Sequence, residues 1–149
     1  MPSKSLTSTS AYQKLFKDIC ALHDAAVVDI SRATGGILKK MGWEIGKRIV
    51  EVEQKGELHA EYGSHLLQKL SEDLSKTNRK GFSVVNLKNM RRVYMAFPIG
   101  QKPARLTWSH YVVLSSIKDD RQRKNYEKNA EKHAWTLEEL KDEIGRAHV

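Results

Sequence analysis

The sequence predicts an all-α fold of about six or seven helices in a single domain. Apolar residues recur at intervals of three and four along most of the chain, which is the spacing of one helix face. No stretch alternates apolar and polar residues in the way that marks a half-buried strand. A chain of 149 residues with 40% apolar residues can supply one core but not two. We therefore expect one helical domain over residues 11–144, preceded by a polar, disordered segment at residues 1–10.

Three helices are expected in the first half of the chain, each from apolar residues at helical spacing. They cover about Tyr12–Arg32, Ile37–Gln54 and Ser64–Ser75. Gly42 and Gly46 lie one turn apart in the second of these helices. Because each glycine in a helix costs roughly 1 kcal/mol relative to alanine, we interpret this pair as admitting a close-packed neighbour.

Four further helices are expected in the second half, and capping signals mark where three of them begin. The expected N-cap residues are Ser83, Thr107 and Thr136. Each lies inside an apolar pair that can form a hydrophobic staple: Phe82 with Leu87, Leu106 with Tyr111, and Trp135 with Leu140. Thr136 with Glu139 also has the spacing of a capping box. The fourth helix should end near Phe97, and a mostly polar sixth helix should cover about Asp120–Lys132.

The positive charge is segregated in the middle of the chain. The whole sequence has 26 Lys+Arg against 18 Asp+Glu, a formal net charge of +8. The segment Leu74–Lys118 contains no acidic residue and holds nine bases: Lys76, Arg79, Lys80, Lys88, Arg91, Arg92, Lys102, Arg105 and Lys118. Segregation of one sign favours a polyanionic partner, and we predict nucleic acid ahead of membrane lipid because the sequence has no strongly amphipathic basic tail.

Several classes of protein are not supported by the sequence. No apolar run approaches the roughly 20 residues of a membrane span, and the N-terminus MPSKSLTSTS lacks the apolar core of a secretory signal. We expect a cytoplasmic protein without membrane association. Cys20 is the sole cysteine, and we interpret it as a buried small hydrophobe. Phosphate loops, Cys/His metal spacings and nucleophile motifs are missing from the sequence, so we expect no cofactor, no metal and no catalytic site.

Three blocks of sequence resemble the N-terminal domain of the YhcG-like bacterial family. They are GWEIGKRI (Gly42–Ile49), YGSHLLQKLSEDLSKTNRKGFSVVNLKNMRRVY (Tyr62–Tyr94) and LTWSHYVVLSSIKDDRQRKNYEKNAEKHAWTLEEL (Leu106–Leu140). The resemblance spans about Tyr12 to Ile144 and implies a helical domain that precedes a PD-(D/E)xK nuclease domain, which this chain does not contain. One position departs from the pattern, because the family usually has an aromatic residue where this chain has Gly42. The resemblance implies DNA-directed work for the parent protein and no catalysis by this chain.

The C-terminal peptide EIGRAHV, Glu143 to Val149, is unusual. It is also the translation of a common short-read sequencing adapter. We therefore expect residues 143–149 to be a non-native end and the natural chain to continue.

The third and fourth expected helices could form a helix-turn-helix unit in which the fourth helix contacts nucleic acid. At about 100° per residue, the apolar residues Leu87, Met90, Tyr94 and Phe97 share one sector. The opposite sector carries Val85, Lys88, Asn89 and Arg92. Its cations suit phosphates, and its amide suits an adenine edge. The connection from Leu74 to Phe82 is longer than the three or four residues of a tight helix-turn-helix.

The predicted nucleic-acid site consists of Arg79, Lys80, Lys88, Asn89, Arg91 and Arg92. Asn86 and Arg91 flank the core side of the helix, and they suit internal hydrogen bonds as well as contacts. The tryptophans Trp43, Trp108 and Trp135 could stack on bases, but their apolar neighbours favour core positions. A helical dimerisation or protein-docking domain with an incidental basic surface, and hence a homo-oligomer, is the alternative function.

Overall fold

The computed structural model describes residues 9–30, 36–54, 63–98 and 106–147, and within these ranges it contains seven helices and no strand. The helices are α1 (Ser10–Ile30), α2 (Gly36–Gln54), α3 (Gly63–Lys76), α4 (Val84–Ala96), α5 (Trp108–Ser115), α6 (Asp120–Lys132) and α7 (Leu137–Ala147). The predicted all-α class is confirmed, and the helix bounds follow the predicted ones closely. Most of the segment expected to be disordered, residues 1–8, lies outside the described residues.

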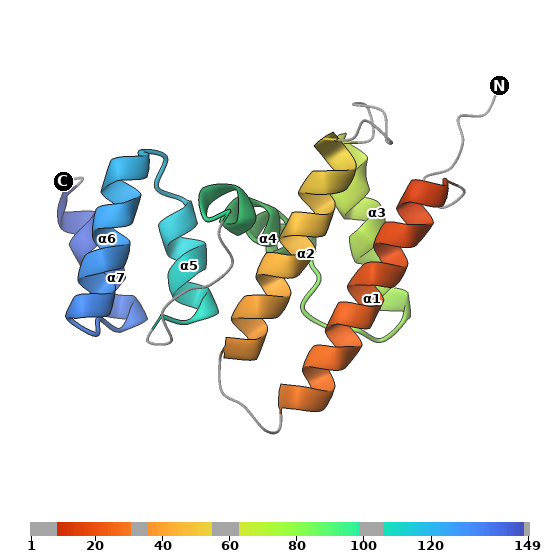
Figure 1. The fold of residues 1–149 in the computed structure, drawn as a ribbon, viewed down its shortest axis with the longest axis horizontal. Coiled ribbons are helices and arrows are strands. Elements are labelled where there is room, and N and C mark those ends of the chain that lie inside the picture. Colours follow the sequence, from red (N-terminus) through yellow and green to blue (C-terminus); the bar gives the residue numbers. More distant parts are fainter. Residues whose placement is uncertain (1–8, 31–35, 55–62, 99–105, 148–149) are drawn as a thin grey trace.

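The helices form an elongated molecule with α4 at its centre (Figure 1). At one end α1 and α2 lie side by side with α3 against them, and at the other end lie α5, α6 and α7. α4 contacts helices of both ends and packs most extensively on α2. The core accordingly divides into two clusters of buried residues that share α4, where the composition predicted one undivided core.

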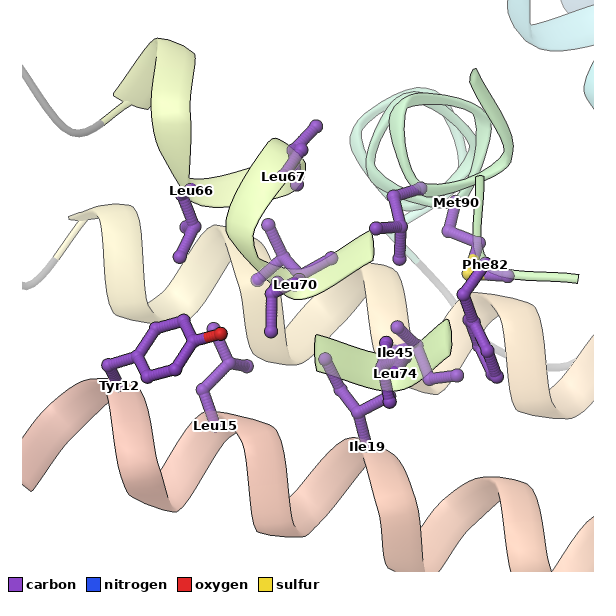
Figure 2. Packing of buried hydrophobic residues seen from close by; sticks show 12 residues of the cluster. Tyr12, Leu15, Ile19, Ile45, Leu66, Leu67, Leu70, Leu74, Phe82 and Met90 are labelled. Atoms are coloured by element: carbon purple, nitrogen blue, oxygen red, sulfur yellow. The ribbon is translucent and has the colours of Figure 1, made fainter. Parts of the chain in front are cut away.

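The first core cluster lies among α1, α2, α3 and the first half of α4 (Figure 2). Its buried members are Tyr12, Leu15, Ile19, Ile45, Ile49, Leu66, Leu67, Leu70, Leu74, Phe82, Leu87 and Met90. The Tyr12 hydroxyl donates to Asp73 Oδ2 at 2.6 Å and so joins α1 to α3. Burial, with the Asp73 hydrogen bond second, raises the pKa of Tyr12, so this side chain remains a neutral donor.

Two neighbouring helices approach α2 closely at its glycines, α4 at Gly46 and α5 at Gly42. A Cβ at Gly46 would lie 2.1 Å from the backbone oxygen of Met90, and one at Gly42 would lie 2.6 Å from the Trp108 ring. Any side chain at Gly46 would therefore push against the main chain of α4. The predicted close-packed neighbour is confirmed at both positions.

The second core cluster lies among the second half of α4 and the helices α5, α6 and α7. Its buried members are Val93, Phe97, Leu106, Tyr111, Leu114, Ile117, Ala130 and Leu140. Two polar side chains of α2 tie it to the rest of the molecule: Trp43 Nε1 donates to the Phe97 carbonyl and Lys39 Nζ to the Leu106 carbonyl, both at 2.7 Å. Burial lowers the pKa of Lys39. Trp43, Trp108 and Trp135 all pack against this cluster, as their apolar neighbours predicted.

Capping interactions begin the helices of the second half at the predicted residues. Ser83 Oγ accepts from the Asn86 amide at 3.1 Å. Thr107 caps α5 and forms a capping box in which His110 takes the third position. Thr136 and Glu139 form the predicted reciprocal pair, at 3.1 and 3.2 Å. The staple residues beside these caps all belong to the two core clusters.

The residues expected to be non-native continue α7 from Glu143 as far as Ala147. Ile144 packs against the second core cluster. His148 and Val149 lie outside the described residues, and the foreign origin of this end stays a prediction.

Candidate nucleic-acid interface

Local sequence fixes the orientation of α4 about its own axis. Ser83 caps the helix, and Phe82, Leu87 and Met90 are buried in the first cluster while Val93 is buried in the second. This side of α4 is therefore held against the domain, and the opposite side must face solvent.

The outward face of α4 carries the residues that the helical projection predicts. Lys88 and Arg92 are exposed, and Asn89 is half-buried between them. Val85 and Met95 flank them, and both are 65% exposed. The structure thus brings together three of the six predicted site residues, Lys88, Asn89 and Arg92, on one face of one helix.

Arg92 is exposed but anchored. Its Nε donates to Ser115 Oγ at 2.9 Å, and its Nη2 donates to the Val112 carbonyl at 3.1 Å. These two bonds join α4 to α5 and restrict the guanidinium, while its charge stays at the surface. The arginine therefore has a structural role as well as an exposed charge.

Arg79 and Lys80 lie in the connection before α4, and only Lys80 has a free side chain. Arg79 donates through Nε and Nη2 to the two carboxylate oxygens of Asp24 on α1, at 2.9 and 2.6 Å. This bidentate pair lowers the pKa of Asp24 to about 2, with a smaller contribution from the neighbouring His23. Lys80 is exposed and forms no ion pair within the described part of the chain.

Arg91 faces α2 rather than solvent. Its Nη1 lies 2.9 Å from Glu53 Oε2, and both side chains are about one quarter exposed, at 29% and 27%. Asn86 donates from Nδ2 to the Gly81 carbonyl at 3.2 Å. Of the two interpretations left open for these residues, internal bonding is the one that the structure shows.

The connection between α3 and α4 is not a tight turn. It covers residues 77–83 and includes two residues with positive φ, Asn78 at 62° and Gly81 at 91°. The length agrees with the sequence-based expectation that any helix-turn-helix here is a loose one. By contrast, α5 and α6 are joined by residues 116–119, a connection of the length found in tight helix-turn-helix units.

Sequence reasoning missed a second basic surface on α6. Arg121, Lys124 and Lys128 are exposed on this helix, with the amides of Gln122 and Asn125 beside them. These five side chains line an open hollow of about 450 Å³. Counting charges along the chain hid this surface because Asp120, Glu127 and Glu131 belong to the same helix; helical spacing, applied to α6 as it was to α4, could have found it.

The described residues hold no group of three or more His, Cys, Asp or Glu side chains that could bind a metal ion. Cys20 is half-buried, and burial raises the pKa of its thiol, which disfavours the nucleophilic thiolate. No helix in the described ranges is long and apolar enough to span a membrane.

Comparison with known proteins places the chain in a family. The model of the DUF1016 N-terminal domain matches residues 18–148. The chain is 31% identical, over an alignment of 177 positions, to the Escherichia coli (strain K12) protein named "Putative nuclease YhcG". The alignment covers 97% of this chain and 47% of that protein, so the chain spans about half the length of this relative. No solved structure matches the chain. The resemblance to YhcG-like proteins is thereby confirmed, and the chain belongs to the DUF1016 N-terminal domain family.

Proposed function

We propose that this chain is the DNA-binding module of a nuclease-linked protein and that it binds duplex DNA with the outward face of α4 and the preceding Lys80. The observation that carries the proposal is the composition of that face. Lys88, Asn89 and Arg92 share one exposed sector of a helix whose opposite side is firmly buried. In this proposal the nuclease activity belongs to the parent protein outside this domain, as it would in the relative named a putative nuclease, of which the alignment covers 47%.

The residues of this face differ in whether their side chains already have partners in the fold, and each suits a different kind of contact with DNA. Lys80 and Lys88 are exposed cations without an ion-pair partner in the described ranges, and they suit backbone phosphates. Asn89 can offer its amide to an adenine edge in the major groove. Arg92 presents a guanidinium that α5 already holds in place, so binding costs it little side-chain entropy.

Arg79 and Arg91 remain in the proposed site with smaller roles. Each would have to exchange a carboxylate partner, Asp24 or Glu53, for a phosphate. The binding free energy gained from such an exchange is only the difference between two charge-assisted interactions. We therefore assign them mainly to positioning the connection and α4.

The test is charge reversal at the two free lysines. Lys80→Glu with Lys88→Glu should remove most of the affinity for a short fluorescent duplex, measured by anisotropy over a range of salt concentrations. The slope of log K against log salt should shrink by roughly 0.9 for each phosphate that the chain no longer neutralises. Arg92 is left unchanged because its replacement would also loosen the packing of α4 on α5.

Lys14→Glu with Lys17→Glu on α1 is the control for net charge, since both lysines are exposed and the change in net charge is the same; unlike the two tested lysines, Lys14 pairs with Asp18 at 3.1 Å. Circular dichroism should show unchanged helicity in both double variants. Equal losses from the two pairs would mean diffuse electrostatic attraction and would contradict a binding face on α4.

One observation favours the alternative function, dimerisation through the same face. Val85 and Met95 are the large hydrophobic residues exposed in the described part of the chain, and both lie on the outward face of α4. An apolar contact between two copies should persist at high salt, whereas DNA binding should weaken steeply. A dimer in sedimentation that is insensitive to salt and is lost in Val85→Ser with Met95→Ser would support this alternative.

A further inference from the structure

The charged side chains of α6 have different surroundings on the two sides of the helix. Towards the domain, Arg123 is only 7% exposed and donates to the Ile117 carbonyl and to Asp120. Glu127 accepts from the Tyr111 hydroxyl at 2.8 Å. Asp119 caps the helix by accepting from the amides of Arg121 and Gln122. The carboxylates of Asp119, Asp120 and Glu127 are therefore engaged within the fold. Glu131 is half-buried and, at about 100° per residue, lies on the side of α6 that carries Asp120 and Glu127, next to Lys124 at the edge of the outward face.

The outward face of α6 is left with cations and amides. At about 100° per residue, Arg121, Asn125, Lys128 and Lys132 fall within one narrow sector opposite the buried Ala130, and Lys124 flanks them. All five are exposed. None of their side chains enters an ion pair in the ranges that the structure describes.

This arrangement fits a phosphate backbone better than other partners. The stripe from Arg121 to Lys132 is about 16 Å long at the helical rise, enough to follow several successive phosphates. Arg121 can bind a phosphate bidentately, and the lysines act as point charges. The exposed sector contains no large apolar residue, so it lacks the anchor that a membrane surface or an apolar protein groove would need.

We propose that the outward face of α6, defined by Arg121, Lys124, Asn125, Lys128 and Lys132, is a second surface that binds the phosphate backbone of duplex DNA. The hollow of about 450 Å³ between Arg121, Lys124 and Lys128 receives a backbone phosphate, and the amides of Gln122 and Asn125 donate beside it. This surface shares its partner with the proposed function but none of its residues. Its contribution should therefore persist when the α4 face is disabled.

The experiment compares three double variants of the whole chain by anisotropy with the same fluorescent duplex. Lys124→Glu with Lys128→Glu tests α6, Lys80→Glu with Lys88→Glu tests α4, and Lys14→Glu with Lys17→Glu is the control for net charge. The α6 pair should lower the affinity more than the control does, and its salt slope should fall by roughly 0.9 for each phosphate released from the surface. Lys124→Arg with Lys128→Arg should bind as the unchanged chain does, and combining the α6 and α4 pairs should add their losses in log K.

The outcomes separate this proposal from the previous one. If the α6 double variant binds more weakly and the α4 double variant does not, the α6 surface is supported and the α4 face is contradicted. If only the α4 double variant binds more weakly, the α6 surface alone is contradicted. If the α6 double variant loses no more DNA affinity than the control does, the α6 surface is overturned. If the chain without substitutions does not bind the duplex at low salt, both proposals are overturned. If the α6 double variant loses affinity for poly-glutamate but keeps its affinity for DNA, the outward face of α6 binds an acidic protein, and its proposed role with DNA is overturned.

Discussion

The two ends of this molecule are held together in different ways. The end formed by α1, α2 and α3 has long helices, of 21, 19 and 14 residues, which interdigitate mainly through leucine and isoleucine (Figure 2). The end formed by α5, α6 and α7 has shorter helices, of 8, 13 and 11 residues. Isolated helices of fewer than about 12–15 residues are marginal in water, so α5 and α7, of 8 and 11 residues, depend most on support from outside the helix.

That support comes from polar side chains that end or join the short helices. His110 is the clearest case: its Nδ1 accepts from the Thr107 amide at 3.1 Å, and its Nε2 lies 2.9 Å from the Trp135 carbonyl. Because Nδ1 is an acceptor, we assign the ring proton to Nε2, which donates a hydrogen bond to the Trp135 carbonyl. Tyr111 and Glu127 add a bond between α5 and α6.

Both ends have a packed core, and the comparison teaches that the short helices of the second end add caps and buried polar partners to theirs. Changes of volume should therefore matter most where α2 meets α4, and loss of polar partners should matter most among α5, α6 and α7. α4 belongs to both ends, which places one candidate binding face at the centre of the molecule and the other on the capped end.

Adding one methyl group where α2 meets α4 should have the largest effect. In Gly46→Ala the new Cβ would lie 2.1 Å from the Met90 backbone oxygen, so α4 would have to move away from α2. We expect a loss of about 3 kcal/mol in the free energy of unfolding, measured by urea denaturation. Gly145→Ala is the matched control, because nothing lies within 4 Å of a Cβ there and alanine should stabilise the helix by roughly 0.5–1 kcal/mol. Similar midpoints for the two variants would refute the close crossing.

Removing the histidine that joins the short helices should have the next largest effect. His110→Ala leaves the Thr107 amide and the Trp135 carbonyl without their partner in a site where the histidine is only 6% exposed. The expected cost is about 2 kcal/mol by urea denaturation. His65→Ala, at an exposed position of α3, should leave the midpoint almost unchanged. If both histidines behave alike, polar support of the second end is not what stabilises it.

Features encoded locally could be predicted from the sequence. The caps at Ser83, Thr107 and Thr136 depend on residues within a few positions, and the structure confirms all three. The glycine pair also indicated a close neighbour, although the sequence could not say that α4 and Trp108 would be the neighbours. The division into two core clusters was not predictable from composition, because it depends on where α4 crosses between them.

The candidate site was less predictable because charge partners are distant in the chain. Arg79 meets Asp24 and Arg91 meets Glu53 across separations of 55 and 38 residues, so an acid-free segment of sequence is not an acid-free surface. The reverse holds for α6, where acids and bases are interspersed in sequence but Arg121, Lys128 and Lys132 lie on a different face from the acidic residues. A helical projection captured the free face of α4 correctly, since it depends only on residues of one helix.

Removing a single cap should have the smallest effect of the three substitutions, and it tests how far the second end depends on capping. Thr136→Ala deletes the hydroxyl that accepts from the Glu139 amide at 3.2 Å and disrupts the capping box at the start of α7. We expect a cost of about 1 kcal/mol in the free energy of unfolding, since one helix start loses its side-chain acceptor. Thr136→Ser keeps the hydroxyl and should restore most of the loss, and Ser75→Ala, at an exposed site in α3, controls for removing a hydroxyl from a helix of the first end. An unchanged denaturation midpoint for Thr136→Ala would mean that α7 is anchored by the packing of Leu140 and Ile144 alone, and the capped end would then resemble the packed end more than its short helices imply.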